Sequence, residues 1–446
     1  MNRPSPDLVR ADAPATGLAR AISGKLLFLF ILGDVLGAGI YALVGTLAGK
    51  VGGAVWVPLL IALVLATLTA ASYAELVTKY PKAGGSAVFA QRAFGRPVVS
   101  FLVGFSMLAA GVTSVAGLAL AFSGSYLSEL VDVPATPAAL VFLVLVALLN
   151  ARGIKESLRA NLVMTVIEVG GLLLIIALAA LVLGRGDGHP GHVLEFDGGS
   201  TPVAGILAAS VIAFYSYVGF ETSANVAEEA VNPSRTYPRA LFGGLAVAGV
   251  VYVGVALAVS VAVDTDTLAA SSGPLLEVVR VADVGLPGWL FSLIALVAVA
   301  NGALLTSIMS SRLTYGMAQD GLLPAGLGRV LPGRRTPWVA IVVTTIVSML
   351  LVLSGDLETL ASTVVLLLLI VFISTNLAVL VLRKDEPGHR HFRTPTVLPV
   401  LGIVSCVVLL TQQEAGVWLR AGLLLVVGVV LHLVTRRFSR PTTVEV

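Results

Sequence analysis

Residues 32–45 read LGDVLGAGIYALVG and lie in the middle of the first long apolar segment of the chain. The stretch contains a carboxylate and four glycines, and each glycine costs about 1 kcal/mol of helix stability relative to alanine. A helix that only anchors a protein in lipid would have leucine at these positions. The stretch therefore specifies something more than a span of lipid.

The composition is that of a polytopic membrane protein. Hydrophobic residues make up 57% of the 446 residues and charged residues only 12%, whereas soluble domains have about a quarter of their residues charged. The isoelectric point near 9.0 does not indicate nucleic-acid binding, because the basic residues occur in small groups between apolar runs. The single cysteine, Cys406, excludes an intrachain disulfide.

Twelve segments are long and apolar enough to be membrane helices, given that a bilayer core of about 30 Å needs roughly 20 apolar residues. They are residues 26–48, 54–78, 98–129, 134–151, 161–184, 204–229, 239–263, 286–317, 337–354, 358–382, 396–413 and 416–435. We expect residues 185–203 and 264–285 to be extracellular loops, and residues 80–97 to form a short interfacial helix.

The distribution of Lys and Arg predicts the orientation, because cytoplasmic loops have the excess of these residues. One set of loops, which includes both termini, holds 24 of the 28, and the opposite set holds Lys50, Arg185, Arg280 and Arg420. This predicts an even number of spans with both termini in the cytoplasm, in the cytoplasmic membrane. Residues 1–24 lack the apolar core of a signal peptide, so we expect a cytoplasmic tail.

The sixth segment is interrupted like the first, since residues 214–225 read FYSYVGFETSAN. Two interrupted helices five spans apart indicate an inverted repeat of five helices with a binding site at the breaks. Free N–H groups of a half-helix attract anions and free carbonyls attract cations, so the two breaks suit a zwitterion such as an amino acid. The glycines alone also fit close helix packing, but the polar residues in both breaks favour a site.

Four motifs resemble the amino acid-polyamine-organocation (APC) superfamily, and the likeness runs from about residue 25 to 435. They are GAGIYAL at 37–43, YAEL at 73–76 with YPKAGGSAVF at 80–89, FYSYVGFE at 214–221 continuing to NPSR at 232–235, and RLTYGMAQDGLLP at 312–324. The resemblance implies an all-α protein of the LeuT-type fold with 12 transmembrane helices. Its parts would be a tail at 1–24, five-helix repeats at 25–185 and 204–383, helices 11 and 12 at 394–435, and a tail at 436–446.

The same resemblance implies a substrate site. The amides around Gly37, Ala38, Gly39 and Ile40 would receive the substrate carboxylate, and the carbonyls of Tyr215, Ser216 and Val218, between Tyr217 and Gly219, would receive its ammonium group. Tyr215 matches an aromatic gate, and the alternative is a tyrosine at a helix interface with its hydroxyl bonded to a neighbour. Because no acidic residue matches the side-chain pocket, we expect a neutral or small amino acid.

Glu168 departs from the family, since several members have a lysine at this position in the fifth helix. An ionisable group about 10 Å inside a membrane helix is a functional candidate, and we expect Glu168 to take part in proton coupling; a structural carboxyl is the alternative. Asn301 aligns with polar residues at the cation site of relatives, and Ser307 is a weaker candidate. Asp34 lies close to the first break, where it could also cap a half-helix.

The remaining charged residues suggest no cofactor or metal site. Glu75, Glu228 and Glu229 are expected at cytoplasmic helix ends, either in ion pairs or solvated. The five histidines lie in loops or near a helix end, and none has metal-ligand spacing within a helix.

The sequence therefore predicts a secondary transporter, not an enzyme, that carries an amino acid through the lipid bilayer by alternating access, with H⁺ as the coupling ion for uptake. An exchanger, or a carrier of amines such as polyamines or ethanolamine, is the alternative. There is no phosphate-binding loop for ATP, no catalytic dyad for an intramembrane enzyme, and no repeated polar rings for a channel.

Overall fold

Apolar helices form almost the whole described chain, which confirms the all-helical class. The computed structural model describes residues 22–37, 39–81, 85–196, 202–331, 334 and 336–438. In these residues, ten helical stretches are long and apolar enough to cross a bilayer. Eight of them contain α3 (Trp56–Lys79), α5 (Pro97–Phe122), α7 (Ala135–Arg152), α8 (Ile154–Arg185), α10 (Pro233–Ala262), α13 (Gly288–Gln319), α15 (Leu357–Val381) and α17 (Ala415–Phe438).

Two further apolar helices are shorter. These helices, α14 (Trp338–Val352) and α16 (Val397–Thr411), have 15 residues each, which is roughly 22 Å of helix at 1.5 Å per residue. All twelve expected apolar segments therefore contain helix, and ten of them reach the length of a full span.

The first and sixth segments are interrupted, as the sequence predicts. The first consists of α1 (Gly24–Val35) and α2 (Gly39–Val51), and the sixth of α9 (Pro202–Tyr215) and a 3-10 helix, η2 (Phe220–Glu229). In the last α-helical hydrogen bond of α1, Leu36 N donates to Leu32 O at 2.8 Å. Non-helical residues separate the two halves in both cases.

Two boundaries differ from the predictions. Helix α8 begins at Ile154 and not at residue 161, because Gly153, with φ of 128°, ends α7 and the polar residues that follow continue as helix. Hydropathy marks where a helix is apolar, and it does not mark where the helix ends. The expected loop at 264–285 contains α11 (Thr265–Ala270) and α12 (Pro274–Ala282), and α12 buries its apolar face against α2 and α8.

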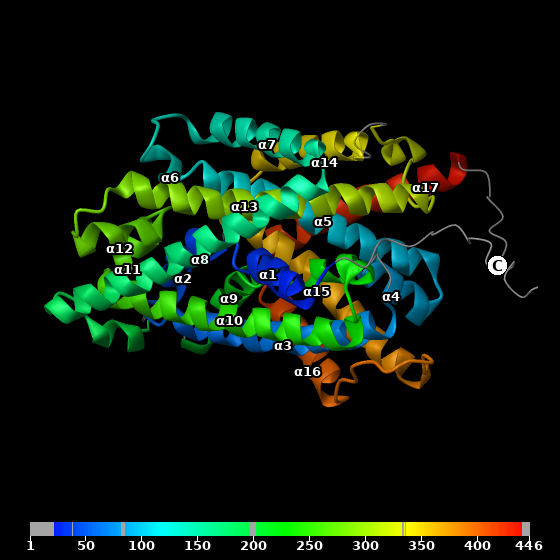
Figure 1. The fold of residues 1–446 in the computed structure, drawn as a ribbon, viewed down its shortest axis with the longest axis horizontal. Coiled ribbons are helices and arrows are strands. Elements are labelled where there is room, and N and C mark those ends of the chain that lie inside the picture. The colour runs from blue at the N-terminus through cyan, green and yellow to red at the C-terminus, as the bar shows by residue number, and fades with distance from the viewer. Residues whose placement is uncertain are drawn as a thin grey trace, which may run out of the picture.

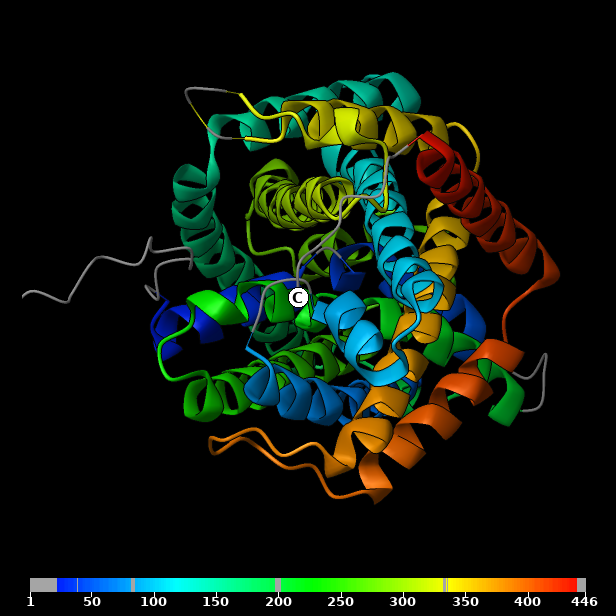
Figure 2. The same cartoon turned by 90° about the vertical axis from the view of Figure 1, so that its right-hand side faces the viewer.

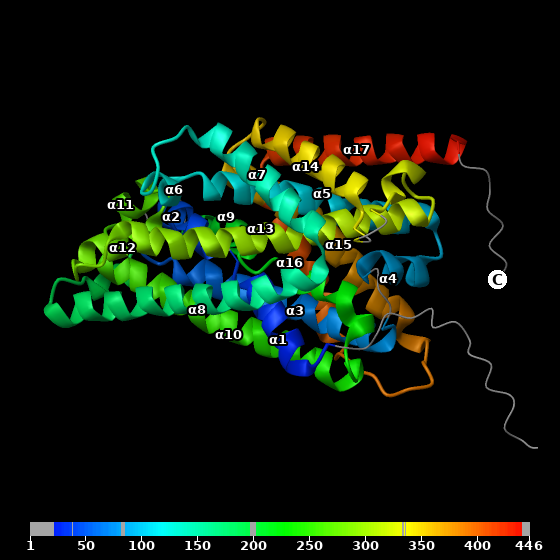
Figure 3. The ribbon, with the colours of Figure 1, turned by 45° about the horizontal axis from the view of Figure 1, so that its top comes forward.

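The interrupted helices lie in the middle of the bundle (Figure 1). Helix α1 packs against α10 and α8 (Figure 3), while on the other side of the breaks α5 packs against both α13 and α15. Helices α7, α14, α16 and α17 lie on the outside (Figure 2), where valine and leucine side chains such as Leu145 and Leu419 remain exposed for lipid. This arrangement places both breaks away from the lipid surface.

The region after α3 contains the expected short helix, α4 (Gly85–Phe94). Nearby, the buried carboxylate of Glu75 forms an ion pair with Arg383 at 3.1 Å and accepts a hydrogen bond from Thr394 N at 2.7 Å. Glu75 thus joins α3 to the segment after α15, as one of the two interpretations of the sequence proposed. The side chains of Glu228 and Glu229 lie outside what the structure describes.

Candidate functional site at the two helix breaks

The first break exposes backbone amides at the start of α2. Residues Gly39 and Ile40 open this helix, and the first amides of a helix have no partner within it. The partial positive charge of a helix N-terminus adds to the attraction for an anion. Ala38 lies outside the described residues, so the geometry of this candidate rests on Gly37, Gly39 and Ile40.

The second break exposes carbonyl groups after α9. Three backbone hydrogen bonds, each between residues three apart, close the C-terminal end of α9. In the last of them, Val218 N donates to Tyr215 O at 3.1 Å. In the described chain, the carbonyl groups of Ser216 and Val218 accept no backbone hydrogen bond. These carbonyls are free to accept from a cation, as expected for the half-helix that ends here.

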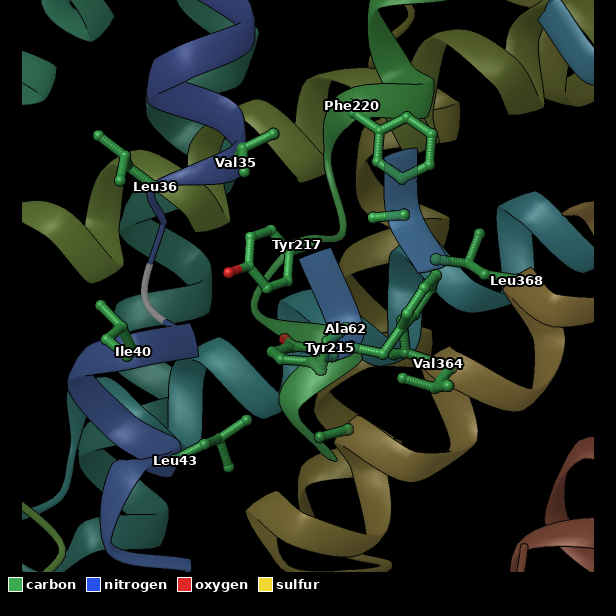
Figure 4. Packing of buried hydrophobic residues seen from close by; sticks show 14 of the residues in the cluster. Val35, Leu36, Ile40, Leu43, Ala62, Tyr215, Tyr217, Phe220, Val364 and Leu368 are labelled. Atoms are coloured by element: carbon green, nitrogen blue, oxygen red, sulfur yellow. The ribbon is translucent and has the colours of Figure 1, made fainter. Parts of the chain in front are cut away.

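The two breaks are in direct contact, and glycine makes this contact possible. A Cβ atom on Gly39 would lie 2.7 Å from Ser216 Cα. Gly219 has φ of 130°, and a Cβ atom there would lie 2.6 Å from the carbonyl oxygen of Asp34. In Figure 4, the break between Val35 and Ile40 lies beside the segment with Tyr215 and Tyr217, and the side chains of Leu36 and Ile40 point away from that segment.

A cavity of about 40 Å³ lies between the breaks, with room for a few water molecules. The lining includes six of the nine predicted substrate residues: Gly37, Gly39, Tyr215, Ser216, Val218 and Gly219. The walls on the other side come from α5, α13 and α15, and they are largely apolar: Met107, Leu118, Met309, Val364 and Leu368. The side chains of Ile40 and Tyr217 are buried away from the cavity, and the Tyr217 ring lies 5.3 Å from that of Tyr252.

Tyr215 lines the cavity, and its hydroxyl also forms a hydrogen bond to a neighbouring helix. Its hydroxyl lies 3.0 Å from Ser114 Oγ on α5. The ring is therefore fixed in the wall, so that both interpretations of this tyrosine, a cavity residue and a bonded interface residue, describe part of its environment.

Two carboxyl groups that the sequence did not place in the pocket line the cavity, Asp34 and Glu221. Thr222 Oγ1 donates a hydrogen bond to Asp34, and Gly219 N donates to Glu221 Oε2 at 2.9 Å. The carboxyl of Asp34 thus bonds across to the other interrupted helix, which differs from the capping role considered for it. These carboxyl groups lie at the breaks, whereas the prediction of no acidic residue concerns the pocket for the substrate side chain. An ionisable residue beside a helix break was the signal that could have identified Glu221.

Glu168 lies outside the cavity and is completely buried. Within the described chain, neither of its carboxylate oxygens has a partner with hydrogen-bond geometry. The side chain of Asn301 lies beside it, and Asn301 Oδ1 is also unpartnered. Asn301 Nδ2 lies 3.5 Å from Thr165 Oγ1, and this hydroxyl contacts α1 where a Cβ atom on Gly33 would lie 2.1 Å away. The structure thus brings Glu168 and Asn301 together directly behind the first break.

Ser307 does not join this group. Its hydroxyl accepts a hydrogen bond from Asn150 Nδ2 on α7 at 3.2 Å. Six residues of helix separate it from Asn301, and at 3.6 residues per turn they rotate the side chain by roughly 240°. Ser307 therefore faces α7 and not Glu168.

Comparison with known proteins identifies the family. Residues 22–430 match the family described as amino acid permease. The chain is 28% identical to the branched-chain amino acid permease BcaP of Bacillus subtilis, with 97% of each chain covered, and 27% identical to the methylthioribose transporter of the same organism, with 97% of this chain and 96% of the relative covered. It is also 28% identical to the vacuolar cationic amino acid transporter 4 of Arabidopsis thaliana, over 85% of this chain and 66% of the relative.

The match covers both helix breaks and every helix that lines the cavity. The relatives are transporters and permeases, not enzymes. The chain therefore belongs to the amino acid permease family of the APC superfamily and is a membrane transporter of amino acids.

Proposed function

We propose that the protein takes up a neutral or small amino acid across the cytoplasmic membrane by alternating access, and that a proton gradient drives the uptake. The observation that carries the proposal is the cavity between the breaks, where amides at the start of α2 and carbonyls at the end of α9 face one space. A carboxylate suits the first group and an ammonium suits the second.

The cavity wall opposite the breaks favours a substrate with a neutral side chain. It consists largely of methionine, leucine and valine, which give a charged side chain no partner. BcaP is named as a permease of branched-chain amino acids, and these are neutral amino acids. Since the cavity holds only a few water molecules in this conformation, Met107 and Met309 would have to move for an amino acid to enter, and methionine adapts its shape easily.

The coupling site that we propose is Glu168 with Asn301. An ionised carboxylate without a partner is costly in an apolar surrounding, and binding of a proton removes its charge. Because Thr165 on α8 contacts both Asn301 and α1 at Gly33, we propose that a change of charge at Glu168 acts on α1 through these two side chains. Occupation by the proton would then shift the balance between outward- and inward-facing states.

The proposal includes the arrangement of the helices in the membrane. The LeuT-type arrangement of two inverted five-helix repeats, 25–185 and 204–383, explains why interrupted helices occur at corresponding places of the two halves. The excess of Lys and Arg in alternate loops supports both termini in the cytoplasm.

The experiment that tests this function is uptake by the purified protein in proteoliposomes, with the twenty amino acids and common amines offered separately. We expect neutral amino acids to accumulate when the outside is acidic, with sodium absent, and preloaded unlabelled substrate to accelerate entry of labelled substrate. Accumulation that requires sodium would contradict proton coupling. Uptake restricted to amines or cationic amino acids would favour the alternative carrier.

A further inference from the structure

Two carboxyl groups from different interrupted helices meet in the wall of the cavity. Asp34 lies in the last turn of α1, and Glu221 is the second residue of η2. Gly219 lies between them, because its amide donates to Glu221 Oε2 and its Cα packs against the backbone carbonyl of Asp34. Both side chains line the cavity although only 7% and 2% of their surfaces are exposed.

The partners present in the protein satisfy only part of this acceptor capacity. A carboxylate has about four acceptor positions, and the hydrogen bonds described above go to one oxygen of each group. In the described part of the chain, Asp34 Oδ1 accepts no hydrogen bond, and the residues that line the cavity include no Lys, Arg or His. The cavity therefore has an excess of hydrogen-bond acceptors and no cationic side chain of its own.

A separate observation also points to a ligand with hydrogen-bond donors. Ser216 Oγ lines the same cavity, is 2% exposed and has no hydrogen-bond partner. A buried hydroxyl without a partner is costly, and one in a cavity wall is available to a bound molecule. The cavity thus presents two carboxyl groups, a hydroxyl and the free carbonyl groups of the second break.

The geometry points to a binding subsite for a primary ammonium group formed by the side chains of Asp34, Glu221 and Ser216. An ammonium has three N–H donors and no acceptor, which matches this set. The inference rests on the proposed function, and it adds side-chain acceptors to the backbone carbonyls. It also orients the substrate, because these acceptors favour the ammonium end while the amides at the N-terminus of α2 favour the carboxylate end.

The chemical consequence is a requirement for the amino group. A 2-hydroxy acid with the same side chain lacks the charge that this subsite recognises, whereas the decarboxylated amine retains it. We therefore expect the protein in its unaltered form to bind the amine and to bind the hydroxy acid poorly.

The test is equilibrium binding to the full-length protein in detergent at constant pH, with the best amino acid of the uptake screen, its decarboxylated amine and its 2-hydroxy acid. We expect Asp34→Asn and Glu221→Gln each to weaken binding of the amino acid and the amine by about tenfold to a hundredfold, the range of a hydrogen bond to a charged group. Ser216→Ala should weaken both severalfold. Ser292→Ala is the matched control, because Ser292 Oγ is equally buried and unpartnered but lies outside the cavity.

The outcomes separate this inference from the proposed function. If the unaltered protein binds the 2-hydroxy acid as tightly as the amino acid, the ammonium subsite is wrong, whether or not the acidic variants fold. Unchanged amine affinity in folded Asp34→Asn and Glu221→Gln would also overturn it, while amino acid transport would stand. Absence of binding for all amino acids would contradict the proposed function itself.

Discussion

Replacement of Gly219 with alanine is expected to reduce amino acid uptake at least tenfold. The residue has φ of 130°, where a side chain is strained, and the added Cβ atom would lie 2.6 Å from Asp34 O and 2.8 Å from Asp34 C. Such strain costs about 1 to 3 kcal/mol, and the contacting backbone atoms cannot move aside as a flexible side chain can. We expect the two breaks to separate, so that the contacts around the cavity are lost.

The measurement is initial uptake into proteoliposomes at equal amounts of reconstituted protein, together with the thermal midpoint in detergent. Gly186→Ala is the matched control. Gly186 also has a positive φ, 84°, but a Cβ atom there would meet nothing within 4 Å. This control should lose roughly 1 kcal/mol of stability at most and retain uptake. Normal uptake by Gly219→Ala would contradict the close contact between the breaks.

Replacement of Glu168 with glutamine is expected to abolish accumulation driven by a pH gradient while exchange of labelled for unlabelled substrate continues. Glutamine has nearly the same shape as a protonated glutamate and cannot release a proton. The variant therefore keeps the coupling site in one state, and Glu168 lies outside the cavity that would bind the substrate. Movement of substrate then no longer follows the proton gradient.

The measurement compares accumulation and counterflow in the same proteoliposomes. Glu358→Gln is the control for loss of a carboxylate, since Glu358 is half-exposed and pairs with Lys50 at 2.8 Å. Exposed ion pairs contribute about 0 to 1 kcal/mol, so this variant should accumulate substrate normally. Proton-driven accumulation by Glu168→Gln at the unaltered level would show that this carboxyl is structural.

The sequence predicts the helices and their breaks well because these depend on local composition. Glycine and polar residues within apolar segments, as at Gly37 and Gly219, identify the interruptions without knowledge of the packing. The start of α8 and the helices α11 and α12 were not predicted, because residues outside the bilayer form helix without the hydropathy signal of a membrane span. The spacing of five spans pairs the two interrupted segments, and the family resemblance assigns them their parts of the substrate site.

The side chains of the cavity are harder to predict because they depend on rotation and on distant partners. Ile40 and Tyr217 are in the interrupted segments, yet both face the protein core. Asp34 bonds to Thr222, which is 188 residues away, so no local pattern reveals that the two acidic residues share a wall with Ser216. For the same reason Ser307, chosen by its place in the eighth span, faces Asn150 instead of Glu168.

The central claim, that an amino acid binds between the two breaks, is tested most directly by an experimental structure with the best substrate bound. We predict density in the cavity, with the substrate carboxylate at the amides of Gly37–Ile40 and its amino group toward Ser216, Asp34 and Glu221. A substrate bound elsewhere in the protein, with the space between Gly39 and Gly219 unoccupied, would contradict the claim.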